Sequence, residues 1–99
     1  MRVTWSPRAR RELDAQQHHM ARDQPAAASR IAARIVVATD RLAAYPLYGR
    51  AAPWDVRHRF RELPVAGTPF VVLYTIDTAS DEVIIVRVVH GAQLRGSDY

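Results

Sequence analysis

Two stretches near the ends of the chain decide its fold: VTWSPRA at residues 3–9 and VIIVRVVHG at residues 83–91. In the first, a short β-forming segment runs into Ser6, a side chain suited to capping a helix. Pro7 then fits the first helical position, where a missing N–H costs nothing. The second stretch predicts a buried strand that ends at a polar corner. Together they indicate one compact domain that opens with a strand and a helix and closes with a strand.

Two amphipathic helices are predicted between these ends. Apolar residues recur at helical spacing after the Ser6 cap, which predicts a helix over residues 7–22. Pro25 marks a break and a new first turn. Beyond it the apolar positions step by three and four as far as Tyr45, which predicts a second helix over residues 25–45. The short linker makes the pair an αα-hairpin.

The rest of the chain predicts strands, because the period changes to two after a loop over residues 46–54. Strands are expected at residues 57–63, 70–76 and 82–90. The last two are apolar on both faces and belong in the middle of a sheet, whereas the first, with three arginines, fits an edge. The order β-α-α-β-β-β predicts a single α+β domain over residues 1–99, with a helical hairpin packed on a small, mainly antiparallel sheet.

Every basic residue is an arginine, and this restricts the chemistry open to the chain. Fourteen basic residues against ten acidic ones give a formal net charge of +4. A genome that favours arginine codons explains the missing lysines, but the consequence for mechanism is the same. The guanidinium binds carboxylates and phosphates through a planar fork and does not titrate, so the chain can stabilise negative charge but has no lysine for catalysis.

The sequence has no feature of a metal, cofactor or membrane protein. It has no cysteine, which excludes disulfides and thiolate metal sites. His18 and His19 are adjacent on a predicted helix and point about 100° apart, which is poor geometry for a shared metal. There is no phosphate-binding glycine loop, no nucleophile elbow, no signal peptide and no apolar run near the ~18 residues of a membrane span. We therefore expect no cofactor and no membrane partner, and a cytoplasmic location in a prokaryote.

The predicted strand over residues 57–63 carries a stripe of arginines, because alternate residues share a face. Its arginines are Arg57, Arg59 and Arg61, and its opposite face carries His58, Phe60 and Glu62. The stripe is either a docking surface for carboxylates or phosphates, or a solvated edge strand whose charge resists aggregation.

Two further residues stand out at the last strand. Arg87 interrupts an apolar strand, so it needs either a salt bridge to Glu62 or an aspartate, or a binding site of which it forms the floor. His90 lies at the strand end and is either a hydrogen-bonded corner or a base. The side chains of the strand half that could move a proton near neutral pH are His58, Glu62, His90 and Tyr99.

Four motifs in a fixed order carry a family resemblance. They are Val3-x-Trp5-Ser6-Pro7-x-Ala9-x-x-x-Leu13, Pro46-x-x-Gly49-Arg50, RELPVxGTPFVVxY at residues 61–74 and VRVVHGAQ at residues 86–93. Over nearly the whole chain they resemble the ParE branch of the RelE/ParE toxin superfamily, whose fold has the same order of strands and helices. The resemblance implies the toxin of a type II toxin–antitoxin pair, with growth inhibition and plasmid stabilisation as its expected effects.

Two activities occur in that superfamily. ParE-like members are non-nucleolytic inhibitors of DNA gyrase, and RelE-like members are ribosome-dependent mRNA endonucleases. The missing lysine, Val71 after Phe70 and the pair His90-Gly91 favour the ParE side. The resemblance then implies a cognate ParD-like antitoxin in a hetero-oligomer, gyrase as target, and contact with DNA only through the antitoxin. A relative that binds its antitoxin but no longer stops growth is a third interpretation.

These implications give two sets of candidate residues. For antitoxin or target binding the candidates are Arg50, Arg57, Arg59, Arg61, Arg87, His90 and Arg95. In the endonuclease alternative, Arg61 and Arg87 stabilise the scissile phosphate, and His90, His58 or Glu62 moves the proton.

Overall fold

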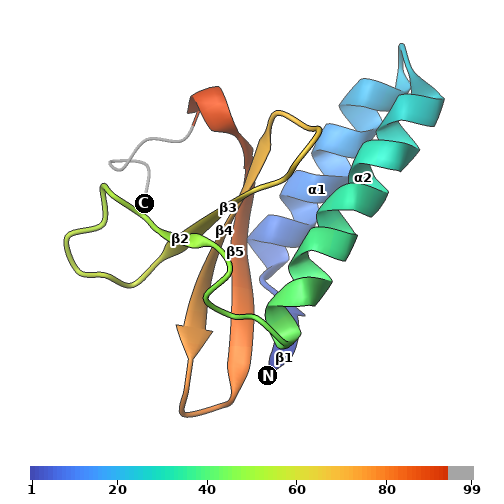
Figure 1. Cartoon of the computed structure of the whole chain (residues 1–99). Coiled ribbons are helices and arrows are strands. Elements are labelled where there is room, and N and C mark those ends of the chain that lie inside the picture. Colours follow the sequence, from blue (N-terminus) through green and yellow to red (C-terminus); the bar gives the residue numbers. More distant parts are fainter. Residues whose placement is uncertain (94–99) are drawn as a thin grey trace.

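In the computed structural model, which describes residues 1–93, two helices cover one face of a five-stranded sheet (Figure 1). The elements are β1 (Arg2–Trp5), α1 (Pro7–Ala21), α2 (Pro25–Asp40), a 3-10 turn (Arg41–Ala43), β2 (Arg50–Ala51), β3 (Arg61–Pro64), β4 (Phe70–Asp77), β5 (Glu82–His90) and a 3-10 turn (Gly91–Gln93). The strand order is β1-β5-β4-β3-β2, with β1 parallel to β5 and the other pairs antiparallel. The predicted α+β class and the central position of β4 and β5 are confirmed. None of the helices in this part of the chain is long and apolar enough to cross a membrane.

The junction between β1 and α1 confirms the predicted cap. The Ser6 Oγ accepts a hydrogen bond from the Ala9 N–H at 3.0 Å and donates one to the Val86 carbonyl at 3.2 Å. The Ser6 N–H also donates to the Ile85 carbonyl at 2.9 Å. One residue therefore starts the helix and fastens it to β5.

The second helix is shorter than predicted. It ends at Asp40, and the chain tightens into a 3-10 turn before Pro46. The residue before a proline disfavours helical geometry, so Tyr45 does not fit as the last helical residue, and the α-helix ends five residues before it. Leu42 is still fully buried, but Tyr45, expected on the apolar seam, is 66% exposed.

The predicted strand over residues 57–63 is also wrong in its first half. Strand β3 begins only at Arg61, and the sheet edge is formed by the two residues of β2. Residues 52–60 form a loop in which His58 has a φ of 54°, a left-handed conformation that no strand residue adopts. The arginine stripe therefore does not exist as one face of a strand.

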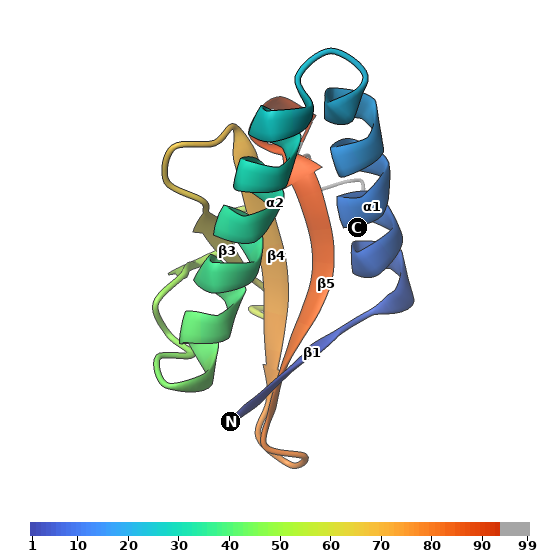
Figure 2. The ribbon, with the colours of Figure 1, turned by 90° about the vertical axis from the view of Figure 1, so that its right-hand side faces the viewer.

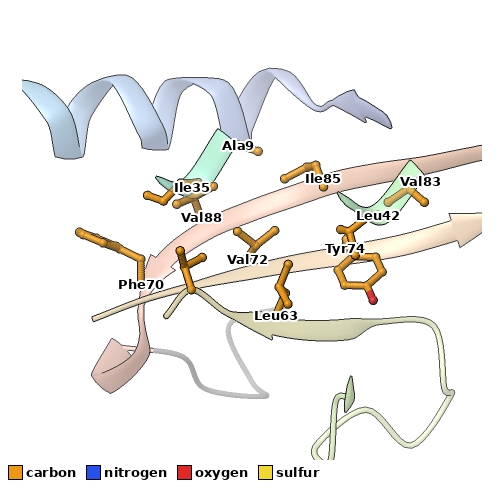
Figure 3. Packing of buried hydrophobic residues seen from close by; sticks show 11 residues of the cluster. Ala9, Ile35, Leu42, Leu63, Phe70, Val72, Tyr74, Val83, Ile85 and Val88 are labelled. Carbon is orange, nitrogen blue, oxygen red and sulfur yellow. The ribbon is translucent and has the colours of Figure 1, made fainter. Parts of the chain in front are cut away.

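The core lies between the helices and the sheet, the two layers seen in Figure 2. Figure 3 shows side chains of both helices meeting those of the central strands. Ile35 and Leu42 from the helical side meet Val72 and Ile85 from the sheet, all four fully buried. Tyr74 is fully buried as well, and its hydroxyl donates to the Pro46 carbonyl at 2.7 Å and accepts from the Gly49 N–H at 2.9 Å. The core thus also fixes the loop that follows α2.

Removing that one hydroxyl should destabilise the protein. Tyr74→Phe leaves the buried Gly49 N–H without its acceptor, so we expect a loss of about 1–3 kcal/mol in the free energy of unfolding. Urea unfolding measures it. Tyr48→Phe, which removes a hydroxyl from a side chain of a residue that is 63% exposed, is the matched control and should change stability by less than about 0.5 kcal/mol. Equal effects from the two variants would contradict the role given to the Tyr74 hydroxyl.

Candidate functional site

Arg61, a candidate for target contact or catalysis, holds the loop after α2. Its Nη2 donates to the Gly49 carbonyl at 2.6 Å and to the Leu47 carbonyl at 3.2 Å, and its Nε donates to the Gly49 carbonyl at 3.1 Å. Two of the guanidinium nitrogens of Arg61 therefore donate to backbone carbonyls of the same chain.

Glu62 is a buried acid on β3, next to the edge strand β2, with 3% of its surface exposed. Its carboxylate accepts from Arg50 Nε at 3.1 Å and from Trp54 Nε1 at 2.8 Å. These contacts tie β2 and the following loop to β3. The Arg50 side chain remains 65% exposed, so its outer face stays open to a partner.

Asp55 organises residues 52–60, which we name the Asp55 loop. Its carboxylate accepts from the backbone N–H groups of Arg57, Arg59 and Phe60. Burial alone raises the pKa of Asp55, but these three donors and the nearby Arg59 guanidinium outweigh it, so the pKa lies below its ordinary value of 3.8. In a strand, these backbone N–H groups would have donated to a neighbouring strand. Here they donate to the Asp55 carboxylate, so residues 57–60 form part of a loop.

The outer part of the Asp55 loop is cationic and exposed. Arg57 and His58 lie at the surface, and Val56 is 86% exposed. The Arg59 guanidinium lies 4.9 Å from the centre of the Phe60 ring and 3.8 Å from the Asp55 carboxylate. Two of the predicted binding arginines, Arg57 and Arg59, thus share one loop.

Arg87 forms a structural ion pair, the first of its two interpretations, but with a different acid than predicted. Its Nη2 lies 2.7 Å from Glu12 Oε2 on α1, and the two side chains are 14% and 21% exposed. The other oxygen of Glu12 accepts from the Val88 N–H at 3.1 Å. Glu62 and the aspartates were the expected partners because the sequence does not show that α1 lies over β5.

His90 was expected to be either a hydrogen-bonded corner or a base, and the structure shows it hydrogen-bonded at the strand end. Its Nδ1 accepts from the Ala92 N–H at 3.2 Å, and its ring lies edge-on to Phe70 with centroids 6.0 Å apart.

Two of the endonuclease candidates, Arg61 and His90, lie well apart along the sheet. Arg61 pairs with Tyr74 in the sheet and His90 pairs with Phe70, so the two lie four residues apart along β4, roughly 13 Å of strand. Arg95 and Tyr99 lie outside the described residues.

A groove between α2 and the end of β3 was missed by the sequence reasoning. It has a volume of about 430 Å³ and an apolar floor that includes Val37, Leu63 and Val65. Its polar rim carries Arg30, Arg34 and Arg41. The sequence held a signal, since these arginines are spaced by four and seven residues and share a helix face, but nothing in it placed β3 beside them.

The three arginines at the rim of the groove are not neutralised by acidic side chains of the described residues. Arg34 Nη1 donates to the Ala66 carbonyl at 3.3 Å, and within residues 1–93 none of the three guanidiniums forms a salt bridge. In the same part of the chain no three metal-binding side chains come together, and His18 and His19 are exposed on α1. The arrangement therefore offers cationic binding surfaces.

Asp55 should hold its loop only while charged. Since its folded pKa lies below 3.8, its stabilising effect is complete above that pH and is lost as the pH falls through the folded pKa. Asp55→Asn removes the charge, and the amide oxygen accepts fewer hydrogen bonds than the carboxylate. Urea unfolding should show the wild type more stable at pH 7, with the difference shrinking below about pH 4. The exposed Asp14→Asn is the control, and a difference that stays constant down to about pH 2.5 would contradict the mechanism.

Comparisons with known proteins agree with this fold. The family model described as the ParE toxin of the type II toxin–antitoxin system parDE matches residues 3–95. The chain is 40% identical to "Putative toxin Y4kP" of Sinorhizobium fredii over 93% of this chain and 90% of that protein. It is 39% identical to "Toxin RelE2" of Caulobacter vibrioides over 93% of this chain and 97% of that protein.

A solved structure shares the fold. It is described as the chromosomal ParDE toxin–antitoxin system from P. aeruginosa, and it superposes with a TM-score of 0.77 at 24% identity, covering 91% of this chain and 95% of that one. With a family match along nearly its whole length, the chain belongs to the ParE family of type II toxin–antitoxin toxins.

Proposed function

We propose that this chain arrests growth by binding DNA gyrase in the cytoplasm, without catalysis, and that a ParD-like antitoxin neutralises it. The observation that carries the proposal is the use of the catalytic candidates as structural residues. Arg61 holds two backbone carbonyls, Arg87 holds Glu12, and His90 accepts from a backbone N–H. An acid–base site needs such groups converging on one reacting atom, whereas a binding protein needs only a rigid, charged surface.

The antitoxin is proposed to lie in the groove between α2 and β3. An apolar floor edged by guanidiniums fits an amphipathic helix with aliphatic residues on one face and carboxylates beside them. A segment of that kind folds on binding and is disordered when free. Contact with DNA is then made by the antitoxin, and the toxin reaches DNA only through it.

An mRNA endonuclease is the second candidate, because one relative bears the name "Toxin RelE2" at 39% identity. In that case Arg61 and Arg87 would stabilise the scissile phosphate of the message on the ribosome, and His90, His58 or Glu62 would move the proton.

Inhibition of purified gyrase tests the proposal against this alternative. We expect the chain to block DNA supercoiling by gyrase in a dose-dependent way, because binding to the enzyme is the proposed mode of action. In cells, induction should give a DNA-damage response and filaments while messenger RNA stays intact. Rapid loss of message, with gyrase unaffected, would replace the proposal by the endonuclease.

Charge reversal in the groove tests the antitoxin site. Arg34→Glu and Arg41→Glu place negative charge where acidic side chains should dock, so each should weaken antitoxin binding by about tenfold. Titration calorimetry with the purified antitoxin measures this, and affinity should also fall with added salt.

The control for that experiment is the pair Arg10→Glu and Arg11→Glu, which makes the same charge change on exposed residues of α1. If the control weakens binding as much as the groove variants do, the antitoxin responds to net charge and not to this groove.

A further inference from the structure

The Asp55 loop projects from the sheet on the side away from the helices. In Figure 1 it is the yellow-green loop at the left, with α1 and α2 at the right. The groove with its arginine rim lies on the helical side, lined by α2. The molecule therefore presents two separate cationic surfaces.

The Asp55 loop is internally fixed although it has no regular secondary structure. Three backbone N–H groups donate to the Asp55 carboxylate. Trp54 donates to Glu62, and its ring stacks on Phe60 with the ring centroids 6.1 Å apart. At its base the Thr75 hydroxyl donates to the Arg59 carbonyl at 2.7 Å. A loop held in one shape loses little entropy on binding, so its contacts are available for affinity.

The loop is held mainly through backbone groups, which leaves the side chains of Val56 and Arg57 free to meet a partner. Val56 has 86% of its surface in water, and Arg57 uses only its backbone N–H inside the loop. Burial of an exposed aliphatic side chain against a partner is favourable, so Val56 would stabilise a complex in which a partner covers it. Arg57 and Arg59, which follow it in the same loop, add charge that a carboxylate would meet, although Arg59 also lies 3.8 Å from the Asp55 carboxylate.

We propose that residues 56–59 of the Asp55 loop are the target-binding element of this toxin. The partner they fit is a protein surface with a small apolar pocket edged by aspartate or glutamate. A phosphate backbone would pair with Arg57 and Arg59 but would leave Val56 uncovered, so the loop favours protein over nucleic acid. The inference rests on the proposed function in one respect, that the toxin acts by binding a protein target.

Two single variants test it without disturbing the loop. Val56→Ser removes the apolar contact and Arg57→Glu reverses the charge, while the acceptor groups of Asp55 stay in place. Each should reduce inhibition of purified gyrase by about tenfold or more, because burial of one valine or one charge-assisted contact is worth that much. Antitoxin affinity should stay within about twofold of wild type, and the unfolding midpoint should be unchanged. Arg11→Glu on α1 is the matched control and should inhibit as the wild type does.

The outcomes separate this inference from the proposed function. Variants that inhibit gyrase and arrest growth as well as the wild type would overturn the inference, and so would variants that lose antitoxin binding together with inhibition. If the unaltered chain arrests growth but does not inhibit gyrase, the gyrase proposal fails. The loop is then judged by growth arrest of the same variants, which must still be weakened. Binding of a labelled DNA or RNA duplex that Arg57→Glu abolishes and Val56→Ser leaves intact would overturn the inference in favour of nucleic acid.

Discussion

The attachment of Ser6 to the bulged edge of β5 is the contact on which the rest of the architecture depends. The β4–β5 register shifts so that Tyr74 faces Ile85 while Leu73 faces Arg87, which leaves Val86 as an extra residue. Ser6 reaches the carbonyls of Ile85 and Val86, and Glu12 accepts the next outward N–H, that of Val88. Strand β1 pairs with β5 only as far as Ile85. After that residue, the first turns of α1 cover the edge of β5 in place of another strand. This fixes α1 on the sheet, and α2 follows because the hairpin linker is short.

Three carboxylates are used inside the molecule, and this explains its cationic exterior. Glu12 pairs with Arg87 and a backbone N–H, Glu62 joins β2 and the Asp55 loop to β3, and Asp55 collects three N–H groups. Glu12 and Asp55 accept backbone N–H groups, whereas Glu62 accepts from two side chains. Within residues 1–93, the arginines that lie at the surface and form no salt bridge are Arg10, Arg11, Arg22, Arg30, Arg34, Arg41 and Arg57. A formal charge of +4 therefore understates how positive the accessible surface is.

The sequence predicts the elements whose information is local and misses what depends on neighbours distant in the chain. The Ser6-Pro7 cap, the first helix and the apolar runs of β4 and β5 are determined by adjacent residues and are confirmed, whereas the helical spacing predicted the second helix five residues too long. The alternation at residues 57–63 was misleading because one carboxylate, Asp55, binds N–H groups that a strand would need. The groove was invisible for another reason, since Arg34 and Leu63 become neighbours only when α2 lies over the sheet. The sequence allowed candidate residues to be chosen by their chemistry, but it did not predict which groups they contact in the folded chain.

Arginine on both surfaces has a consequence for how the protein responds to its surroundings. A guanidinium keeps its charge at every physiological pH, so neither the groove nor the outer face of the Asp55 loop is switched off by mild acid. Ionic strength is the condition that weakens such contacts, since salt screens exposed charges over about 8–10 Å. The acid that shapes the Asp55 loop is ionised well below neutrality, because its pKa is lowered by the backbone donors around it. Both surfaces therefore stay formed and charged together across the physiological pH range, so neither is switched by protonation, and selection between the two proposed partners would come from shape and from which partner is present.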